Sequence, residues 1–183
     1  MILAGSLKGK DPLHTFVLAT NTENSVDLRT VVLRKTDVKN RLLYFHSDVR
    51  APKVDQIRHT KEVAILFYDP IKRIQIRIKA KPFLHGGDIF SEELWSETRL
   101  SARKYYLSHK PPGSFLENAF DSLPDHLHGF DPNREESENG KTNFLVVSLH
   151  VIHIDWLFLC SQGHKRASFL YNENGYEGSF INP

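Results

Sequence analysis

The feature that most constrains the fold is a stretch, residues 29–53, in which two apolar runs of strand length are flanked by basic residues. The second run, residues 42–46, leads directly into a segment that starts a helix near Pro52. Proline is favoured in the first turn of a helix, and Ser47 or Asp48 is the kind of residue that caps one. The stretch therefore predicts a strand, a turn, a second strand and a helix start.

Basic side chains are concentrated at this helix start. Arg50 and Lys53 lie within it, and Arg29 precedes the first strand run. Cations near a helix N-terminus oppose the macrodipole, so their placement costs stability unless an anion lies among them. Backbone N–H groups at a helix start also bind phosphate. We therefore expect a ligand that carries a phosphate group.

Composition limits the classes of function. With 183 residues, 40% hydrophobic and 25% charged, the chain suits one compact domain over residues 1–183. A net charge of +2 from 24 basic and 22 acidic residues argues against a broad nucleic-acid surface. Cys160 is the only cysteine, and no apolar run approaches the roughly 20 residues that span a bilayer. We expect a cytoplasmic protein with no membrane or nucleic-acid partner.

The first half of the chain has the pattern of antiparallel strands. Residues 15–20 and 26–34 predict a hairpin, and residues 42–46 are expected beside its second strand. Residues 63–67 predict a buried strand. Residues 74–79 alternate strictly, with isoleucines on one face and polar residues on the other, which makes them the clearest strand in the sequence.

The second half mixes helix, loop and strand signals. Residues 88–107 look helical, and residues 114–141 predict a long surface loop because their periodicity fades. Residues 144–149 and 151–160 predict two strands or one long bent strand, and residues 166–171 another. Short strands with helices as insertions favour a mainly β, antiparallel barrel over a doubly wound sheet.

Several motifs resemble, in spacing and order, those of the pyridoxamine 5'-phosphate oxidase family of FMN-binding split barrels. They are residues 29–34, His46-Ser47 with residues 50–53, Gln56-Ile57, residues 64–68, and Gln75 within residues 73–78. The resemblance covers roughly residues 15–81, with looser extensions over 95–114 and 156–166. It implies a split antiparallel β-barrel that binds FMN. It implies the following cofactor-binding residues: Arg29, Thr30, Val31, Val32, Arg34, His46, Ser47, Arg50, Lys53, Gln75, Trp156 and Arg166.

The chemistry of FMN suits several of these residue types. Its dianionic phosphate calls for charge-assisted donors such as Arg29, Arg50 and Lys53. An amide such as Gln75 both donates and accepts, which matches the pyrimidine edge of the isoalloxazine ring. A cation such as Arg34 near that ring would favour the reduced, anionic flavin. No acid or base stands out as a catalytic residue.

Structural explanations compete with these roles. Arg29 and Arg34 could be solvated charges, since most charged residues are exposed. They lie five positions apart and would face opposite sides of a regular strand, so one ligand can meet both only if the strand bends or ends between them. Gln75, Arg77 and Lys79 would ordinarily form the wet face of a half-buried strand.

The substrate residues of the oxidases are matched less fully. Those oxidases bind the substrate phosphate with Tyr, Arg and Ser at four-residue spacing, and Tyr106, Lys110 and Ser114 match that spacing with Lys for Arg. They also carry an Arg-x-His-x-Arg run soon after a tryptophan. Here Arg166 matches the first arginine of that run, but Ser168 and Leu170 stand where the oxidases have the histidine and the second arginine. We therefore expect oxidation of pyridoxamine phosphate to be slow or absent.

Three classes of function remain open: an FMN-dependent oxidoreductase acting on a small molecule, a flavin carrier or sensor without turnover, and a heme-handling split barrel. His126 or His128 would be the candidate heme ligand. With Asp125 and Asp131 nearby they could also hold a metal, but the polar loop lacks a second spaced ligand pair, so we expect no metal site.

The apolar pattern also bears on assembly. Residues 15–20 and 31–33 are apolar at successive positions, so one small barrel interior cannot hold all their side chains. The resemblance implies that a second subunit covers the remainder and that FMN lies between subunits. We therefore expect a homodimer with two FMN sites.

Overall fold

The computed structural model describes residues 1–119 and 122–183. Its contacts divide the chain into two compact units. Unit 1 contains Met1–Phe45, His59–Phe83 and Ser148–Pro183, and unit 2 contains His46–Arg58 and Leu84–Val147. Strands β4 (Leu42–Asp48), β6 (Ile74–His85) and β7 (Phe144–Phe158) contribute residues to both units.

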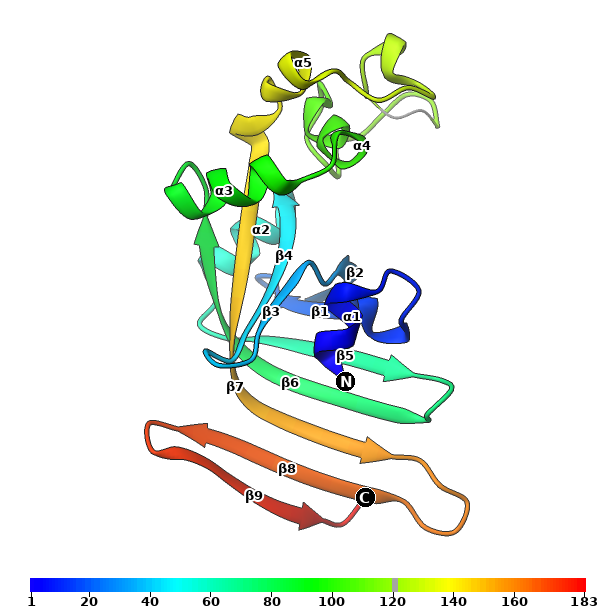
Figure 1. Cartoon of the computed structure of the whole chain (residues 1–183), viewed down its shortest axis with the longest axis vertical. Helices are drawn as coiled ribbons and strands as arrows, with labels where there is room; N and C mark the ends of the chain where they lie inside the picture. Colours follow the sequence, from blue (N-terminus) through cyan, green and yellow to red (C-terminus); the bar gives the residue numbers. More distant parts are fainter. Residues whose placement is uncertain (120–121) are drawn as a thin grey trace. The chain divides into compact units, whose positions relative to one another are not determined.

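The strands of the described residues form one nine-stranded sheet (Figure 1). Their order is β2-β1-β5-β6-β7-β4-β3, with β8 beside β7 and β9 beside β8. The predicted hairpin is confirmed, because β1 (Thr15–Asn21) pairs antiparallel with β2 (Val26–Val32). The predicted strand at residues 63–67 is β5 (Val63–Asp69), which pairs antiparallel with β1 and with β6.

One expected pairing was wrong. Residues 42–46 do not lie beside β2; their strand, β4, pairs antiparallel with a short strand β3 (Lys35–Asp37). The reason is that β2 ends at Val32 and the chain resumes extended structure only at Lys35, so β3 takes the hairpin position. The strand therefore ends between Arg29 and Arg34, which is one of the conditions under which both could reach one ligand.

Alternation along β6 sets the two faces of the sheet. Ile74, Ile76 and Ile78 are buried, whereas Arg77 and Lys79 between them are exposed, as the sequence predicted. On β1 the buried residues are Phe16, Leu18 and Thr20, and the Phe16 and Phe67 rings lie 5.0 Å apart. Burial of such apolar side chains supplies most of the stability of a sheet of this kind.

The N-terminal segment packs on this core. It comprises α1 (Ile2–Leu7) and a 3-10 turn η1 (Pro12–His14). Gly5 allows close approach to η1, because a Cβ on it would lie 2.3 Å from the Leu13 carbonyl oxygen.

The C-terminal part of unit 1 is an antiparallel extension of the sheet. The long-strand alternative for residues 144–160 is confirmed, since β7 is a single strand of 15 residues. Strand β8 (Lys165–Asn172) pairs with β7, and β9 (Gly175–Ile181) pairs with β8. The sequence analysis missed β9, whose residues are all exposed, although an Asn-Gly pair at Gly175 is a strong hairpin signal.

Unit 2 is mostly helical outside its strand segments. Its short helices are α2 (Pro52–Arg58), α3 (Ile89–Glu97), α4 (Leu100–Arg103) and α5 (Arg134–Glu138), with 3-10 turns η2 (Lys104–Leu107), η3 (Asp125–Leu127) and η4 (Lys141–Asn143). An Asp88 capping box starts α3, and the predicted helix over 88–107 is interrupted between α3 and α4. The predicted loop over 114–141 was wrong at α5, which Asn133 caps.

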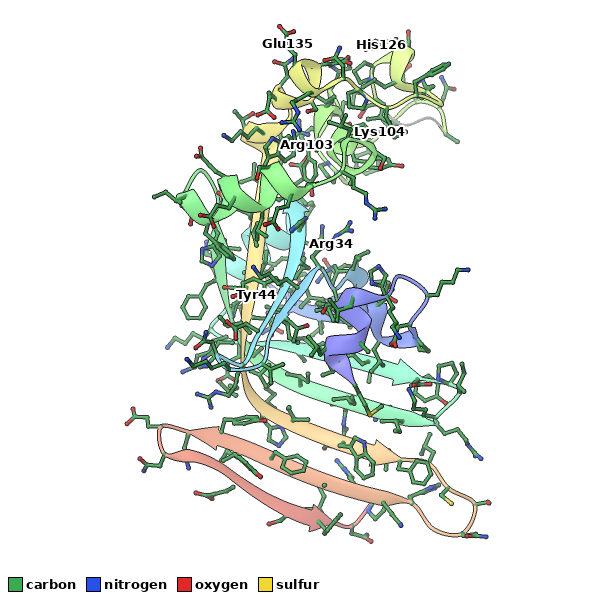
Figure 2. The ribbon with its side chains drawn as sticks, in the orientation of Figure 1. Arg34, Tyr44, Arg103, Lys104, His126 and Glu135 are labelled. Atoms are coloured by element: carbon green, nitrogen blue, oxygen red, sulfur yellow. The ribbon has the colours of Figure 1, made fainter. Side chains whose placement is uncertain are left out.

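A buried arginine links the helices of unit 2. Arg103, which is only 4% exposed, donates to the Trp95 carbonyl at 2.7 Å and to Glu138 Oε1 at 2.8 Å (Figure 2). Its guanidinium also lies 4.6 Å from the centre of the Trp95 ring. Because its hydrogen bonds reach α3 and α5, this side chain links the two helices.

Candidate cofactor site

A cavity of about 690 Å³ lies on the polar face of the sheet in unit 1 and is called the Gln75 cavity here. Strands β1, β2, β5, β6, β7 and β8 all contribute to it. Its polar lining residues are Gln75, Arg77, Lys79, His153, Asp155 and Arg166. Those on β6 and β7 occupy odd positions, so the pleat places them on one face of each strand, and Arg166 reaches the same cavity from β8. The volume lies in the range of ordinary ligand pockets.

Gln75 is half-buried on β6 and lines this cavity. Within the part of the chain that the structure describes, its side-chain amide makes no hydrogen bond. A partly buried amide normally finds partners for its oxygen and its NH₂ group. Gln75 is thus available to hydrogen-bond a ligand, and its donor and acceptor both suit the flavin edge.

Asp155 organises the cations of the cavity. It is 7% exposed and accepts two hydrogen bonds from Arg166, at 3.1 Å from Nε and 2.8 Å from Nη2. It also accepts one from Arg77 Nη2 at 2.6 Å, although the two residues lie far apart in sequence. The hydrogen bonds from Arg166 lower the pKa of Asp155; burial opposes them, and the charge of Arg77 lowers the pKa further. Asp155 therefore remains a carboxylate that holds two arginines.

The sequence analysis missed Asp155, and a histidine at the position of His153 is more often a hydrogen-bonded strand residue than a ligand. His153 Nε2 lies 2.8 Å from Ser168 Oγ, a contact that fixes its ring beside β8. A signal for both existed, because they occupy alternate positions of a predicted strand. What the sequence could not supply was the pairing of β7 with β8, which places Asp155 opposite Ser168 and next to Arg166.

The expected phosphate-binding residues of unit 2 do lie together. Lys53 Nζ is 3.3 Å from Ser47 Oγ, and Ser47 is buried. Arg50 donates to Asp48 Oδ2 at 2.7 Å and to the Ser108 carbonyl at 3.1 Å. Hydrogen bonds to Asp48 raise the pKa of Arg50. Asp48 accepts from the Arg50 backbone at 2.8 Å, in the turn that precedes α2.

The other predicted residues of β2 and β4 are distributed over both faces of their strands. Arg29 is half-buried, donates to Thr20 Oγ1, and lies 3.6 Å from Asp27. Burial lowers its pKa, and the charge of Asp27 opposes this. Val31 is buried, whereas Thr30 is exposed and Val32 is half-buried. Arg34 is exposed beyond the end of β2 (Figure 2). In unit 2, the His46 ring contacts Phe144 at 4.8 Å.

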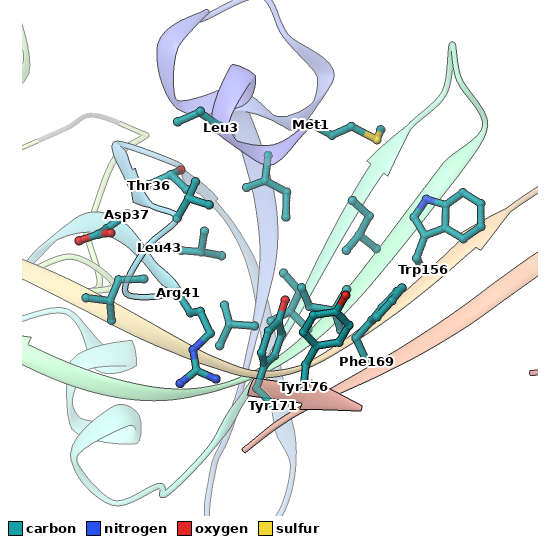
Figure 3. Close-up of a pocket in the computed structure, with 17 residues that line it drawn as sticks. Met1, Leu3, Thr36, Asp37, Arg41, Leu43, Trp156, Phe169, Tyr171 and Tyr176 are labelled. Atoms are coloured by element: carbon teal, nitrogen blue, oxygen red, sulfur yellow. The ribbon is translucent and has the colours of Figure 1, made fainter. Parts of the chain in front are cut away.

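Trp156 does not share a cavity with Gln75 and Arg166. It lines a second cavity of about 670 Å³, called the Trp156 cavity here, on the opposite face of β6 and β7 (Figure 3). Ile76 and Ile154 line this cavity, as even positions on the same strands. Of the three predicted flavin residues on β6, β7 and β8, the structure therefore brings two together and separates the third.

The predicted substrate residues lie in unit 2. Tyr106 is half-buried in η2, and its ring contacts Trp95 at 5.7 Å and Phe144 at 5.2 Å. Lys110 and Ser114 are exposed. The Tyr106 carbonyl accepts a hydrogen bond from Asn143 Nδ2 at 2.8 Å. The Tyr106 ring thus packs in an aromatic cluster, while the other two side chains face solvent.

The histidines have local partners. His126 Nε2 forms a hydrogen bond with Glu136 Oε1. Among the described residues there is no group of three or more His, Cys, Asp and Glu side chains placed to hold a metal.

His164 accepts a hydrogen bond from the Cys160 backbone at 3.1 Å. If Arg166 is taken as the last arginine of the Arg-x-His-x-Arg run, His164 falls on its histidine, an alignment that the sequence analysis did not consider.

Comparison with solved structures identifies the class of fold. A pyridoxamine 5'-phosphate oxidase-related, FMN-binding protein from Nostoc punctiforme superimposes with a TM-score of 0.78 at 22% identity, covering 100% of this chain and 94% of its own. PhzG from Burkholderia lata, solved in complex with tetrahydrophenazine-1-carboxylic acid, gives 0.69 at 16% identity, covering 93% and 82%. These similarities confirm the predicted split-barrel fold.

The sequence is also similar to a known family over its N-terminal part. Residues 2–86 match the family model described as pyridoxamine 5'-phosphate oxidase, FMN-binding domain. This match confirms the family resemblance and FMN as the predicted cofactor. A comparison with curated proteins gave no match. Over the described residues, no helix has the length and apolar character needed to cross a membrane.

Proposed function

We propose that this chain is an FMN-dependent oxidoreductase whose isoalloxazine ring is held at the Gln75 cavity. The observation that carries the proposal is the Gln75 amide, which lines a cavity of about 690 Å³ and makes no hydrogen bond within the described residues. The pyrimidine edge of the ring offers carbonyl acceptors and an N–H donor. One amide side chain satisfies both kinds of group.

For unit 2 taken by itself, we propose that Ser47, Arg50 and Lys53 bind a phosphate group. Three of the five guanidinium N–H groups of Arg50 already donate to Asp48 and Ser108, which leaves two for a ligand. Lys53, 3.3 Å from Ser47 Oγ, adds a second positive charge. Two cations and a hydroxyl suit a dianion, because charge-assisted hydrogen bonds are the strongest available here.

Bound FMN would supply the hydride chemistry. The residues of the Gln75 cavity would set its electrostatics: Arg77, Lys79 and Arg166 bring positive charge, which favours negative charge on a reduced ring. Asp155 offsets part of that charge and fixes the orientation of Arg77 and Arg166. Tyr106, Lys110 and Ser114 remain the proposed contacts to a small-molecule substrate.

Homodimerisation is part of the same proposal. Several large apolar side chains of unit 1 are exposed, including Leu28 at 67%, Leu170 at 53% and Phe180 at 83%. Apolar surface of this kind could be covered by a second copy of the chain. A second copy that buried about 2,000 Å² would form an obligate dimer with two equivalent FMN sites. Light scattering at micromolar concentration tests this, and a stable monomer that binds FMN tightly would contradict it.

Cofactor binding is tested by comparing FMN with riboflavin, which lacks the phosphate. Wild type should bind riboflavin weakly, and Lys53→Ala should cost about 1.5 to 3 kcal/mol of FMN affinity. Lys39→Ala, at an exposed lysine outside the proposed site, is the matched control and should leave affinity unchanged. Equal affinity of wild type for the two ligands would overturn the phosphate assignment.

Turnover is tested separately on the FMN-loaded protein. Stopped-flow mixing with NADPH should bleach the flavin absorbance, and oxygen should restore it. A protein that binds FMN tightly but is reduced by neither NADPH nor amine substrates would be a flavin carrier or sensor, which would refute the oxidoreductase assignment while retaining the binding site.

A further inference from the structure

The Trp156 cavity has no role in the function proposed above, and its residues come entirely from unit 1. It encloses about 670 Å³ and lies beside the N-terminal helix α1 (Figure 3). That volume is typical of a site for a small organic molecule. Most of its lining is aliphatic or aromatic, with few polar groups.

Aromatic rings form one wall of this cavity. Phe169 and Tyr171 come from β8, and Tyr176 comes from β9. The Tyr176 ring lies 6.0 Å from Phe169 and 5.9 Å from Tyr171, with interplanar angles of 62° and 55°. Trp156 lines the cavity from β7. Tilted and edge-on rings of this kind pack well against a further flat aromatic ring.

Arg41 is the cationic side chain among the residues that line this cavity. The Arg41 guanidinium lies 5.0 Å from the centre of the Tyr171 ring, and it forms no ion pair within the described part of the chain. Arg41 also contributes to positive potential: burial lowers the pKa of His150, and the charges of Arg41 and Lys81 lower it further. Arginine bound only to a ring face retains donors for a carboxylate.

The acidic side chain of the cavity, Asp37, already has hydrogen-bond partners. Asp37 accepts hydrogen bonds from the Asn40 backbone at 2.9 Å and from Asn40 Nδ2 at 2.7 Å. In Figure 3 its carboxylate points away from the aromatic side chains. Its charge opposes an anionic ligand, but it lies on the side remote from Tyr171 and Tyr176. Arg41 therefore dominates the charge at the aromatic wall.

One further polar group faces no protein partner. The Thr36 Oγ1 atom is buried and lacks a hydrogen-bond partner within the described residues, and Thr36 lines the same cavity. Buried hydroxyls are usually satisfied. A polar substituent on a bound molecule would satisfy this one.

We propose that the Trp156 cavity binds a planar aromatic carboxylate, with its ring against Trp156, Tyr171 and Tyr176 and its carboxylate on Arg41. The site is distinct from the Gln75 cavity, because the two lie on opposite faces of β6 and β7. Binding therefore does not require FMN, and the inference stands or falls independently of the proposed function.

The test uses 2-naphthoate as the probe and the full-length chain, with and without FMN. Calorimetry should show one site per chain with the same affinity in both states. Arg41→Gln should weaken binding at least tenfold. Arg73→Gln is the matched control, since Arg73 is an exposed arginine of unit 1 with nearly the same left-handed backbone, φ 56° against 58° for Arg41. It should change nothing.

Nuclear magnetic resonance locates the probe. The chain has two tryptophans, so its spectrum contains two indole N–H signals, which Trp95→Phe assigns. Addition of 2-naphthoate should shift the Trp156 signal and leave that of Trp95 in place. Tyr176→Ala, at a residue 64% exposed, removes part of the wall without threatening the fold and should also weaken binding.

Three results would overturn the proposal. The first is equal affinity for 2-naphthoate and its uncharged methyl ester, or tighter binding of 2-naphthylmethylamine, because Arg41 would then play no part. The second is competition between 2-naphthoate and FMN, which would place the acid at the flavin site. The third is no binding at millimolar concentration to wild type that is folded by circular dichroism.

Discussion

The Gln75 cavity and the Trp156 cavity share strands β6, β7 and β8 and differ in almost every other respect. Odd positions of β6 and β7 give the first its amide, its carboxylate and the cations Arg77 and Lys79. Even positions of the same strands give the second Ile76, Ile78, Ile154 and its tryptophan. A period of two residues is enough to produce two chemically different sites, because successive side chains of a strand point to opposite faces.

The cavities also differ in how their charges are held. In the Gln75 cavity, the buried Asp155 carboxylate binds Arg77 and Arg166 in fixed positions. In the Trp156 cavity, Arg41 rests on an aromatic ring and has no ion pair within the described residues. The first arrangement is preorganised for a ring whose charge changes, and the second leaves a cation available to a carboxylate.

The largest expected effect concerns the choice of substrate and bears on the Gln75 cavity. Oxidation of pyridoxamine phosphate should be about two to four powers of ten less efficient than in the true oxidases, because two polar contacts of roughly 1.5 to 3 kcal/mol each are missing. Arg166, moreover, already donates two hydrogen bonds to Asp155. Oxygen uptake in a steady-state assay measures this.

A control for that assay distinguishes the two alignments of the Arg-x-His-x-Arg run. Any turnover should be unaffected by Ser168→Ala and by His164→Ala if neither binds substrate. Loss of turnover on His164→Ala alone would assign Arg166 to the last position of the run. Efficiency equal to that of the oxidases would show that the missing contacts are unimportant.

The second effect is on stability and probes the apolar face. Ile76→Gln should lower the free energy of unfolding by about 3 to 5 kcal/mol, because it places an amide where the native side chain is 5% exposed. Gln75→Ile, one position away on the polar face, should change stability by less than about 1 kcal/mol. Urea denaturation measures both, and similar losses in the two variants would contradict the assignment of faces.

The third effect isolates the carboxylate of the Gln75 cavity. Asp155→Asn should cost about 1 to 2 kcal/mol at pH 7, less than a fully buried pair, since the side chains of Arg77 and Arg166 remain 47% and 24% exposed. The folded-state pKa of Asp155 lies below its ordinary value, so its contribution is full above that ordinary value of about 4 and is lost as pH falls through the folded pKa.

The measurement for this third effect is urea denaturation from pH 7 to pH 2. The difference between wild type and Asp155→Asn should shrink below about pH 4 as the wild-type carboxylate becomes protonated. A difference that stays constant over the whole range would mean that Asp155 acts through shape rather than through charge.

The smallest effect concerns the cofactor. Gln75→Ile should weaken FMN binding by about 1 kcal/mol, roughly fivefold, because one or two neutral hydrogen bonds are lost. Tyr176→Ala, on the other cavity, is the control and should leave FMN affinity unchanged. If Tyr176→Ala weakened FMN binding more than Gln75→Ile, the flavin would belong to the Trp156 cavity.

Much of the fold followed from local pattern. The alternation of residues 74–79, the hairpin over residues 15–34 and the continuity of residues 144–158 all describe side chains close in sequence, where propensity and periodicity act directly. Gln75, Arg77 and Lys79 were placed on one face for the same reason, and the structure brings that face to a cavity. Family resemblance added FMN, which composition alone could not supply.

Other features depended on which distant strands become neighbours. Arg77 and Asp155 meet because β7 and β8 extend the sheet that contains β6, and no local signal marks that contact. The same applies to β4, which pairs with β3 and not with β2, and to the aromatic wall, which requires β9 to pair with β8. Sequence by itself therefore determined the faces of each strand, since a strand's pleat is a local property. Tertiary structure decided which faces share a cavity, because pairing order is settled by the burial of the whole core.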